Sequence, residues 1–207
     1  MIHSLEHDWE VSPKEAIQLQ KDLAARVIAE WPGPQVAIIA GVDTSYRKGM
    51  ARAAVVVLTY PDLELVEDVA IERKVDFPYV PGLLSFREGP AVMESLARLK
   101  HKPDLLIFDG QGIAHPRRFG IASHIGVLVG LPSIGCAKSR LVGRYEEPGE
   151  DRGSVSLLLH KGDTVGAVVR TRKKVKPVFV STGHLIDLEQ SVAFVLNCCR
   201  GYRLPET

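Results

Sequence analysis

Two short apolar stretches decide the fold: Val36-Ala37-Ile38-Ile39-Ala40-Gly41-Val42-Asp43 and Leu105-Leu106-Ile107-Phe108-Asp109. Each is too brief for a buried helix and consists largely of aliphatic residues, so each predicts a central strand of a sheet. Both stretches end in an aspartate. Because open α/β sheets bind their ligands at the carboxyl ends of central strands, these two carboxylates also predict where a functional site lies.

The remaining sequence predicts the other elements of an α/β fold. Ser12-Pro13-Lys14-Glu15 is typical of a helix start, and the apolar spacing after it predicts a helix that stops near Trp31. We expect further strands at residues 53–58, 63–75, 133–136, 155–160, 164–170 and 178–181, and further helices at residues 83–100, 121–131 and 187–199. The first three strands should form antiparallel neighbours. The order of the elements favours a mixed central β-sheet flanked by helices on both faces, in a single domain over residues 1–207.

The composition excludes several classes of protein. With 207 residues, of which 45% are hydrophobic and 25% charged, the chain is neither disordered nor collagen-like. The longest uncharged stretch, residues 119–137, contains His124, Pro132 and several glycines, and would insert poorly into a membrane. The acidic start of the chain does not resemble a signal peptide, and three cysteines without a CxxC pair are typical of a reducing compartment. We therefore expect a cytoplasmic protein.

Asp43 and Asp109 are the first candidates for a metal site. If their strands are parallel neighbours, the two carboxylates lie roughly 5 Å apart, and such a pair repels itself unless it shares a cation or retains a proton. Glu88 is the best third member, because the helix that carries it must pack against the same sheet. Oxygen ligands without a Cys or His cluster favour Mg²⁺ or Mn²⁺ over zinc. In the alternative interpretation the two aspartates only cap the turns after their strands.

Two unusual loops carry polar and aromatic side chains. Residues 109–120 include three glycines, whose amides could donate to an anion or a base edge, and basic side chains that could hold phosphates. Residues 77–82 place Tyr79 between two prolines, and a stiff aromatic tip can wedge between stacked bases. The alternatives are an exposed turn with solvated arginines and a Pro-rich turn with Tyr79 in the core. His124, near the next helix start, could equally be a core residue.

Four motifs together resemble the endonuclease V family. They are Val42-Asp43-Thr44-Ser45-Tyr46, Pro78-Tyr79-Val80-Pro81-Gly82-Leu83-Leu84-Ser85-Phe86-Arg87-Glu88-Gly89-Pro90, Asp109-Gly110-Gln111-Gly112 through His115-Pro116-Arg117, and Ile134-Gly135-Cys136-Ala137-Lys138. The resemblance implies a ribonuclease-H-like fold and Mg²⁺-dependent cleavage of nucleic acid containing deoxyinosine, the product of adenine deamination, with Mn²⁺ able to substitute. Members of the family cut the second phosphodiester bond 3′ to the lesion, which leaves a 3′-hydroxyl and a 5′-phosphate.

The resemblance also implies roles for individual residues. It assigns five residues to catalysis: Asp43, Glu88, Asp109, Lys138 and His184, the first three of them as metal ligands. It assigns the strand-separating wedge to Tyr79 with Pro78, Val80 and Pro81. We further expect a base pocket built from the backbone of Gly82, Leu84, Gly110 and Gly112, and phosphate contacts from His115, Arg117 and Arg118. For His184 the alternative is a surface residue that precedes the last helix.

The distribution of charged residues along the chain indicates what kind of partner the protein binds. A net charge of +1 excludes a uniformly basic coat. However, residues 62–72 carry five acidic and no basic residues, whereas residues 170–176 carry five basic and no acidic ones. We expect a monomer that binds inosine-containing DNA, with RNA left open, and no membrane. The rival hypotheses are another ribonuclease-H-like nuclease such as a Holliday-junction resolvase, a non-catalytic binding module, and a sugar-kinase-like fold.

Overall fold

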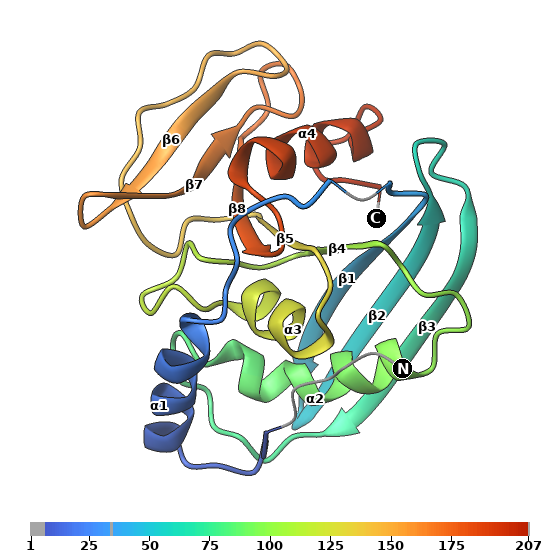
Figure 1. Ribbon diagram of the computed structural model, residues 1–207, viewed down its shortest axis with the longest axis vertical. Coiled ribbons are helices and arrows are strands. Elements are labelled where there is room, and N and C mark those ends of the chain that lie inside the picture. The colour runs from blue at the N-terminus through green and yellow to red at the C-terminus, as the bar shows by residue number, and fades with distance from the viewer. Residues whose placement is uncertain (1–6, 34, 207) are drawn as a thin grey trace.

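An eight-stranded sheet runs through the molecule in the order β3-β2-β1-β4-β5-β8-β7-β6 (Figure 1). The computed structural model describes residues 7–33 and 35–206. The strands are β1 (Ile38–Arg47), β2 (Met50–Thr59), β3 (Leu65–Lys74), β4 (Leu105–Phe108), β5 (Ser133–Ala137), β6 (Val155–His160), β7 (Asp163–Val169) and β8 (Val178–His184). The helices are α1 (Pro13–Ala24), α2 (Leu84–Ala97), α3 (Ile121–Val129) and α4 (Leu188–Cys198).

The sheet is mixed, as predicted. β1 and β4 pair in parallel, as do β4 and β5, so the two aspartate-bearing strands are parallel neighbours. The remaining pairs are antiparallel, and β1, β2 and β3 form the expected consecutive antiparallel strands. The parallel centre therefore brings the carboxyl ends of β1, β4 and β5 to one edge of the sheet, where a ligand site is expected.

Helices cover both faces of the sheet, which confirms the second part of the prediction. Side chains alternate along the central strands: Ala40 and Phe108 belong to the apolar cluster that includes residues of α2 and α3, whereas Ile39 and Ile107 belong to the cluster that includes residues of α4. The strands β1 and β4 are thus buried on both sides, which is why their sequences read as continuous apolar stretches.

Several element ends differ from the prediction, and those of the first helix, β1 and β8 have a clear physical reason. The first helix ends at Ala24 instead of near Trp31, because the amides of Arg26 and Val27 bond back by only three residues and the chain then turns. This turn packs Val27 against a small buried cluster of Leu23, Phe119 and Val127. β1 continues past Asp43 to Arg47, since its pairing with β2 outlasts its apolar residues. β8 runs three residues beyond the predicted end, to His184, because its pairing with β5 continues to Thr182 and His184.

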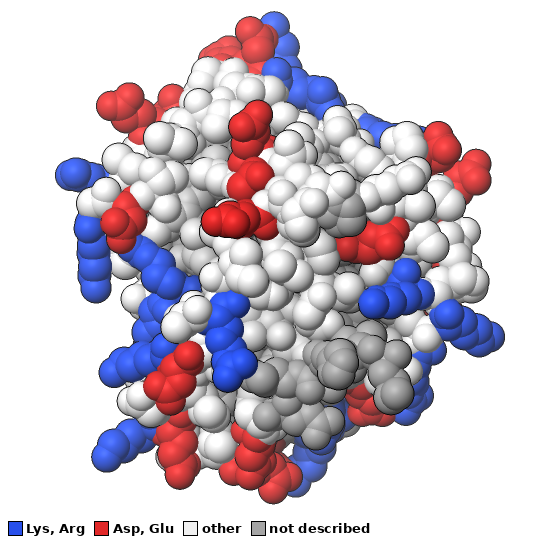
Figure 2. All heavy atoms as spheres, viewed as in Figure 1, with Lys and Arg blue, Asp and Glu red and all other residues white. Residues whose placement is uncertain are grey.

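Charged side chains of both signs are spread over the face of the molecule shown in Figure 2. Lys and Arg side chains gather along the side on which α1 lies, and acidic side chains interrupt them elsewhere. This distribution agrees with the expectation that no uniformly basic coat is present. Within residues 7–33 and 35–206, no helix combines the length and the apolar character needed to cross a membrane.

Candidate active site

Two aspartates lie side by side where β1 and β4 run in parallel. Val42 pairs with Phe108, and the backbone N–H of Asp109 donates to the carbonyl of Val42 at 3.0 Å. Asp43 is the next residue of β1, so the chain folds both carboxylates onto the same edge of the sheet. Asp43 is exposed, and one of its carboxylate oxygens accepts a hydrogen bond from the backbone N–H of Thr44 at 2.8 Å.

A third carboxyl group, that of Glu88, approaches the two aspartates from α2. It is only 5% exposed and accepts a hydrogen bond from the hydroxyl of Thr44. Burial raises the pKa of Glu88; the Thr44 hydrogen bond and the charge of Arg87 oppose this rise, and the charges of Asp43 and Asp109 add to it. The three carboxyl groups therefore act on one another electrostatically, as members of a single site.

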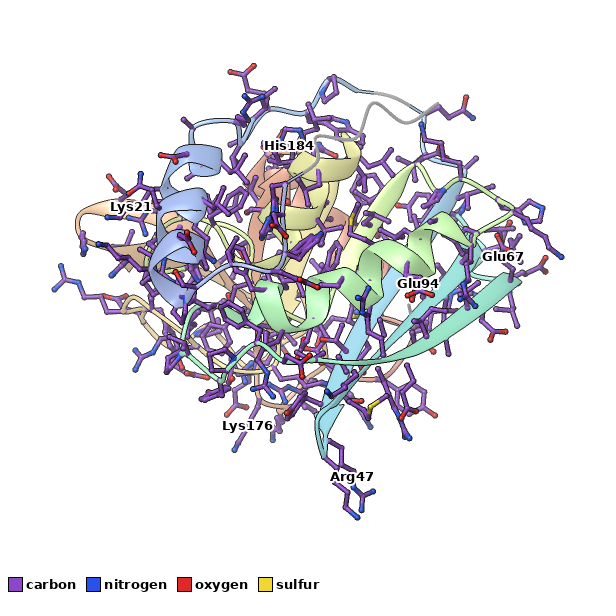
Figure 3. The ribbon with its side chains drawn as sticks, turned by 90° about the horizontal axis from the view of Figure 1, so that it is seen from below. Lys21, Arg47, Glu67, Glu94, Lys176 and His184 are labelled. Atoms are coloured by element: carbon purple, nitrogen blue, oxygen red, sulfur yellow. The ribbon has the colours of Figure 1, made fainter. Side chains whose placement is uncertain are left out.

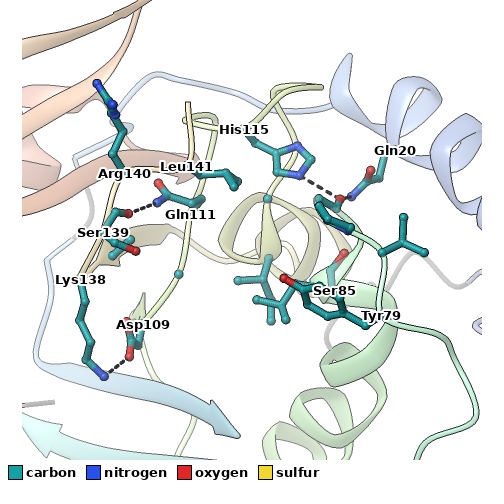
Figure 4. A pocket seen from close by; sticks show the side chains of 18 residues that line it. Gln20, Tyr79, Ser85, Asp109, Gln111, His115, Lys138, Ser139, Arg140 and Leu141 are labelled. Carbon is teal, nitrogen blue, oxygen red and sulfur yellow. Dashed lines mark hydrogen bonds and ion pairs between the residues drawn. The ribbon is translucent and has the colours of Figure 1, made fainter. Parts of the chain in front are cut away.

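Lys138 brings a positive charge to this site. It directly follows β5, and its ammonium group donates to a carboxylate oxygen of Asp109 (Figure 4). This hydrogen bond raises the pKa of Lys138, and the charges of Asp109 and Asp43 raise it further against the effect of burial. The ammonium group thus faces both aspartates.

The donor chemistry of this carboxylate cluster fits a hard divalent cation. Oxygen ligands of concentrated negative charge suit Mg²⁺ or Mn²⁺, and a cation would relieve the repulsion between carboxylates, which adds to the rise that burial causes in the pKa of Glu88. In the part of the chain that the structure describes, no group of three or more His, Cys, Asp or Glu side chains is arranged as a ready ligand set. In this structure the carboxyl group of Glu88 is bonded to Thr44 and that of Asp109 to Lys138. A cation would compete with these two partners.

A cavity of about 380 Å³ opens beside the carboxylates (Figure 4). Its volume falls in the range of about 300–1,000 Å³ that is common for sites of small ligands. Asp109 and Lys138 form part of one wall. Most residues predicted for the wedge and the base pocket also line it: Tyr79, Val80, Pro81, Gly82, Leu84 and Gly110. Pro78 and Gly112 are not among the lining residues.

The rim of the cavity is a tight turn whose sequence explains its shape. The N–H of Leu83 donates to the carbonyl of Val80 at 2.9 Å, with Pro81 and Gly82 between them. Pro fixes the first central position of such a turn, and the second requires a positive φ, which Gly82 adopts at +80°. Tyr79 precedes this turn and is 72% exposed, and its role as a wedge stays a prediction.

A buried arginine supports this tyrosine. The guanidinium group of Arg87 lies 3.5 Å from the ring centre of Tyr46 and 5.4 Å from that of Tyr79. Stacking of a planar cation on aromatic faces is favourable, especially away from water. Sequence reasoning assigned no role to Arg87 or Tyr46, although each lies next to or near a predicted carboxylate in a recognised motif.

Three side chains converge on the carbonyl oxygen of Gly82. Gln20 Nε2 donates to it at 3.0 Å, His115 Nε2 at 2.9 Å and Arg117 Nη2 at 2.7 Å. Burial, chiefly, and the charge of Arg117 lower the pKa of His115 to about 4, so its ring is neutral. In this structure His115 Nε2 and Arg117 Nη2 are bonded to the carbonyl of Gly82 and not free for a ligand. The phosphate contacts expected of the two residues stay predictions.

Gln20 is a site residue that sequence reasoning missed. It lies on α1, is buried, and also accepts a hydrogen bond from Arg117 Nε at 2.5 Å. The signal was present in the sequence: a glutamine at helical spacing between Ala16 and Leu23 interrupts the apolar stripe of the helix. A polar residue at a core-facing position is expected to meet a buried partner.

Arg118 points away from this network. Its guanidinium group bonds to the ring and the carbonyl of His160 and to the carboxylate of Asp163, all on the β6–β7 hairpin. Its backbone adopts a φ of +58°, which turns the loop at this point. The structure therefore uses Arg118 to tie the loop to the hairpin, and its phosphate contact stays a prediction.

Gly112 packs the loop against β8. Its amide donates to Ser181 Oγ at 2.9 Å, and a Cβ atom at this position would lie 1.9 Å from the carbonyl oxygen of Thr182. Only glycine permits so close an approach of two backbones. The Gly112 amide is bonded inside the protein in this structure, and its role as an amide donor in the pocket stays a prediction.

The structure does not bring His184 to the carboxylates. His184 pairs with Ser133 at the start of β5, whereas Lys138 follows Ala137 at the end of that strand. Its Nδ1 accepts a hydrogen bond from the backbone N–H of Ile28 at 3.3 Å, and burial lowers its pKa. Figure 3 shows His184 on the opposite side of the molecule from Arg47, which ends β1. The alternative interpretation, a surface histidine before the last helix, is wrong, because His184 is buried at the end of β8.

Comparisons with known proteins identify close relatives. The sequence model of the family described as Endonuclease V matches residues 21–207. Endonuclease V of Roseiflexus sp. strain RS-1 is 52% identical over 207 residues, which cover 100% of this chain and 93% of that protein. Endonuclease V of Gloeobacter violaceus is 51% identical over 205 residues, which cover 97% of this chain and 83% of that protein.

Solved structures show the same similarity. The crystal structure of Endonuclease V from Streptomyces avermitilis has a TM-score of 0.92 and 45% sequence identity, covering 100% of this chain and 92% of that one. Endonuclease V of Ciona intestinalis, in complex with a 24mer DNA containing an inosine followed by a ribo-adenosine, has a TM-score of 0.79 and 30% identity, covering 93% of this chain and 91% of that one. The fold shared with these structures confirms the expected α/β, ribonuclease-H-like class.

Proposed function

Because the chain belongs to the endonuclease V family, we propose that it is an endonuclease that cuts DNA containing deoxyinosine, with Mg²⁺ as cofactor and Mn²⁺ able to replace it. The bond cut is the second phosphodiester 3′ to the lesion, and the products carry a 3′-hydroxyl and a 5′-phosphate. One observation carries this proposal: a single cavity is lined both by the exposed Tyr79 and by the Asp109–Lys138 pair. A flipped base and the reacting backbone would thus be held a short distance apart.

The cavity is suited to a base that has left the helical stack. Enzymes that act on one base commonly extrude it into a pocket and fill the gap with another group. Tyr79 is the group that fills the gap, since it is exposed on a rigid turn beside the cavity. Amides of Gly82, Leu84 and Gly110 would donate to the 6-oxo group of hypoxanthine and disfavour the 6-amino donor of adenine. Leu84 begins α2, and the first amides of a helix lack intrahelical partners.

The chemistry takes place at the carboxylate cluster. Asp43, Glu88 and Asp109 would hold the metal, which when bound orients a water, lowers its pKa and offsets charge on the phosphate. Thr44 holds the buried Glu88 by its hydrogen bond. The ammonium group of Lys138 is half exposed and would move from Asp109 to the scissile phosphate, whose charge it stabilises.

Three further properties belong to the same proposal. We place the enzyme in the cytoplasm, a reducing compartment that suits three buried cysteines in thiol form. The whole chain acts as one domain, which is supported by the continuous eight-stranded sheet. We also propose that it acts as a monomer.

The test compares matched 24-base-pair duplexes, about two helical turns long, that contain deoxyinosine or deoxyadenosine at one position. Cleavage of the deoxyinosine strand with Mg²⁺ or Mn²⁺, and its loss in EDTA, is the expected result. The ends of the products are mapped by labelling either terminus. Equal cutting of both duplexes, or a preference for a four-way junction over inosine, would overturn the proposal. An inosine-containing RNA strand in the same assay decides between DNA and RNA.

A further inference from the structure

A chain of hydrogen bonds runs from the cavity wall to the N-terminal segment. Ser85 Oγ lies 2.9 Å from His124 Nδ1. His124 Nε2 lies 2.7 Å from His7 Nε2. His7 Nδ1 in turn lies 2.8 Å from the carbonyl oxygen of Asp8. Ser85 is one of the residues that line the cavity (Figure 4), so the chain connects the cavity to a segment far from it in sequence.

With a neutral His7 ring, the last acceptor fixes the direction of every bond in this chain, whereas a doubly protonated His7 would donate from both nitrogens and reverse the bonds beyond it. A carbonyl oxygen can only accept, so His7 Nδ1 carries a proton. In a neutral ring His7 Nε2 then accepts, and His124 Nε2 must donate to it. His124 Nδ1 is consequently unprotonated and accepts from the hydroxyl of Ser85. The single proton of Ser85 Oγ is therefore used on the inner side, and only lone pairs remain for a ligand.

Packing holds His124 in this neutral state. Its side chain is fully buried, and the rings of Phe119 at 4.9 Å, Trp9 at 5.1 Å and Phe86 at 5.2 Å surround it. Burial lowers the pKa of His124 well below its usual value, and the neighbouring His7 lowers it further. The planes of the His7 and His124 rings are inclined by only 24° with centroids 4.8 Å apart, so the rings lie nearly edge to edge and their two Nε2 atoms face each other.

We infer that Ser85 is a specificity-determining residue whose hydroxyl oxygen accepts the N1–H of hypoxanthine, and that His124 and His7 are positioning residues that fix the polarity of this hydroxyl. The inference rests on the proposed function. Hypoxanthine carries a proton on N1, whereas adenine presents a lone pair there, so adenine would leave two acceptors facing each other. Sites built around a hydrogen bond to one partner discriminate strongly against a ligand that cannot make it.

A spectroscopic measurement tests the relay without any substrate. In ¹⁵N-histidine-labelled protein at neutral pH, nitrogen shifts distinguish the two neutral tautomers. We expect His7 as the Nδ1–H tautomer and His124 as the Nε2–H tautomer, with a coupling between the two Nε2 atoms across their hydrogen bond. The reverse tautomers, or a signal that shows no hydrogen bond between the rings, would overturn the inference.

Kinetics test the role of the hydroxyl. Ser85→Ala should lower the ratio of kcat/KM for deoxyinosine over deoxyadenosine duplexes about tenfold, mainly through KM for deoxyinosine. The matched control is Ser95→Ala, because Ser95 is a buried serine of the same helix whose hydroxyl donates to backbone carbonyls. An unchanged ratio in Ser85→Ala, with wild-type cutting of deoxyinosine, overturns the inference and leaves the proposed function intact. Failure of the wild type to cut deoxyinosine overturns both.

Two variants of His7 test the positioning role. His7→Phe keeps an aromatic ring beside His124 but removes the acceptor, so the same loss of discrimination is expected. His7→Gln retains an acceptor and should restore the ratio to within about twofold of the wild type. If both variants discriminate as the wild type does, the relay does not set the polarity of Ser85. If both lose discrimination equally, the segment acts only by packing.

Discussion

The ammonium group of Lys138 donates to the carboxylate of Asp109, and the two residues follow different strands. Asp109 follows β4 and Lys138 follows β5, and these strands are parallel neighbours. Each residue is the first polar side chain after a buried strand, so the topology alone brings them to one edge. The lysine offsets part of the negative charge that Asp43, Glu88 and Asp109 accumulate there.

Removing the lysine charge should slow the chemical step. We expect Lys138→Met to lower single-turnover cleavage of a deoxyinosine duplex about 10²- to 10³-fold, the usual effect of losing one preorganised charge at a developing oxyanion. Binding of the uncleaved duplex should change little, because the contact is made mainly to the scissile phosphate. The control is Lys102→Met, an exposed lysine before β4. Cleavage at the wild-type rate would remove Lys138 from the mechanism.

Asp43 should be required for cleavage but not for binding. Asp43→Ala removes one proposed metal ligand and should reduce cleavage at least about 10³-fold, because metal catalysis supplies several kcal/mol of charge stabilisation. Lesion binding, measured by fluorescence anisotropy in EDTA, should stay within about threefold, since this side chain does not line the cavity. Asp68→Ala on the exposed side of β3 serves as the control. Robust cutting by Asp43→Ala with Mg²⁺ would contradict the metal assignment.

Tyr79 should contribute to lesion binding and hardly to stability. Its ring is 72% exposed, so Tyr79→Ala leaves the fold intact. Loss of base stacking on an aromatic ring is worth about 1–3 kcal/mol, and the affinity for a deoxyinosine duplex should fall about tenfold or more. Tyr202, with 68% exposure, provides a matched control as Tyr202→Ala. Equal affinities for the wild type and Tyr79→Ala would rule out the wedge.

The sequence predicted those parts of the fold and the site that depend on local patterns. Continuous apolar stretches identified β1 and β4, and the aspartates after them were found because strand direction places them at one edge. The Pro81-Gly82 pair identified a turn, whose positive φ at Gly82 the structure shows. These features are determined by residues that are close together in the sequence, so they can be recognised from the sequence alone.

The parts that escaped prediction depend on long-range contacts. Nothing local shows that Gln20 of α1 reaches the carbonyl of Gly82, or that Ser85 meets His124. His184 was assigned to the site by resemblance, and only the register of β8 against β5 shows that it lies at the other end of the strand. β1 is longer than its apolar stretch because residues 44–47 stay paired with β2, and this pairing cannot be recognised from the sequence of β1 alone.

The position of His184 in the structure and the catalytic role that resemblance implies for it predict different effects of the same substitution. His184→Asn keeps an acceptor for the N–H of Ile28 and should retain cleavage of deoxyinosine within about threefold of the wild type. The thermal midpoint should fall by a few degrees, because a buried ring is replaced by a smaller group. A loss of cleavage above about 10²-fold with an unchanged thermal midpoint would instead support the role implied by resemblance.

His115 should make the protein sensitive to mild acid. Its pKa is 6.5 in an ordinary environment and about 4 in the folded protein, so the unfolded chain binds the proton more tightly. The stability that the neutral ring provides is therefore complete above pH 6.5 and is lost as the pH falls towards 4, by about 3 kcal/mol in total. His115→Gln keeps a donor for the carbonyl of Gly82 but does not titrate.

We expect the free energy of unfolding of His115→Gln, from urea denaturation at a series of pH values, to fall less steeply than that of the wild type between pH 6.5 and 4. Both proteins still contain the buried His124, whose lowered pKa gives them a common acid sensitivity, so the difference between the two curves isolates His115. Parallel curves for the wild type and His115→Gln would show that the ring is already protonated in the folded protein or titrates as it does in the unfolded chain.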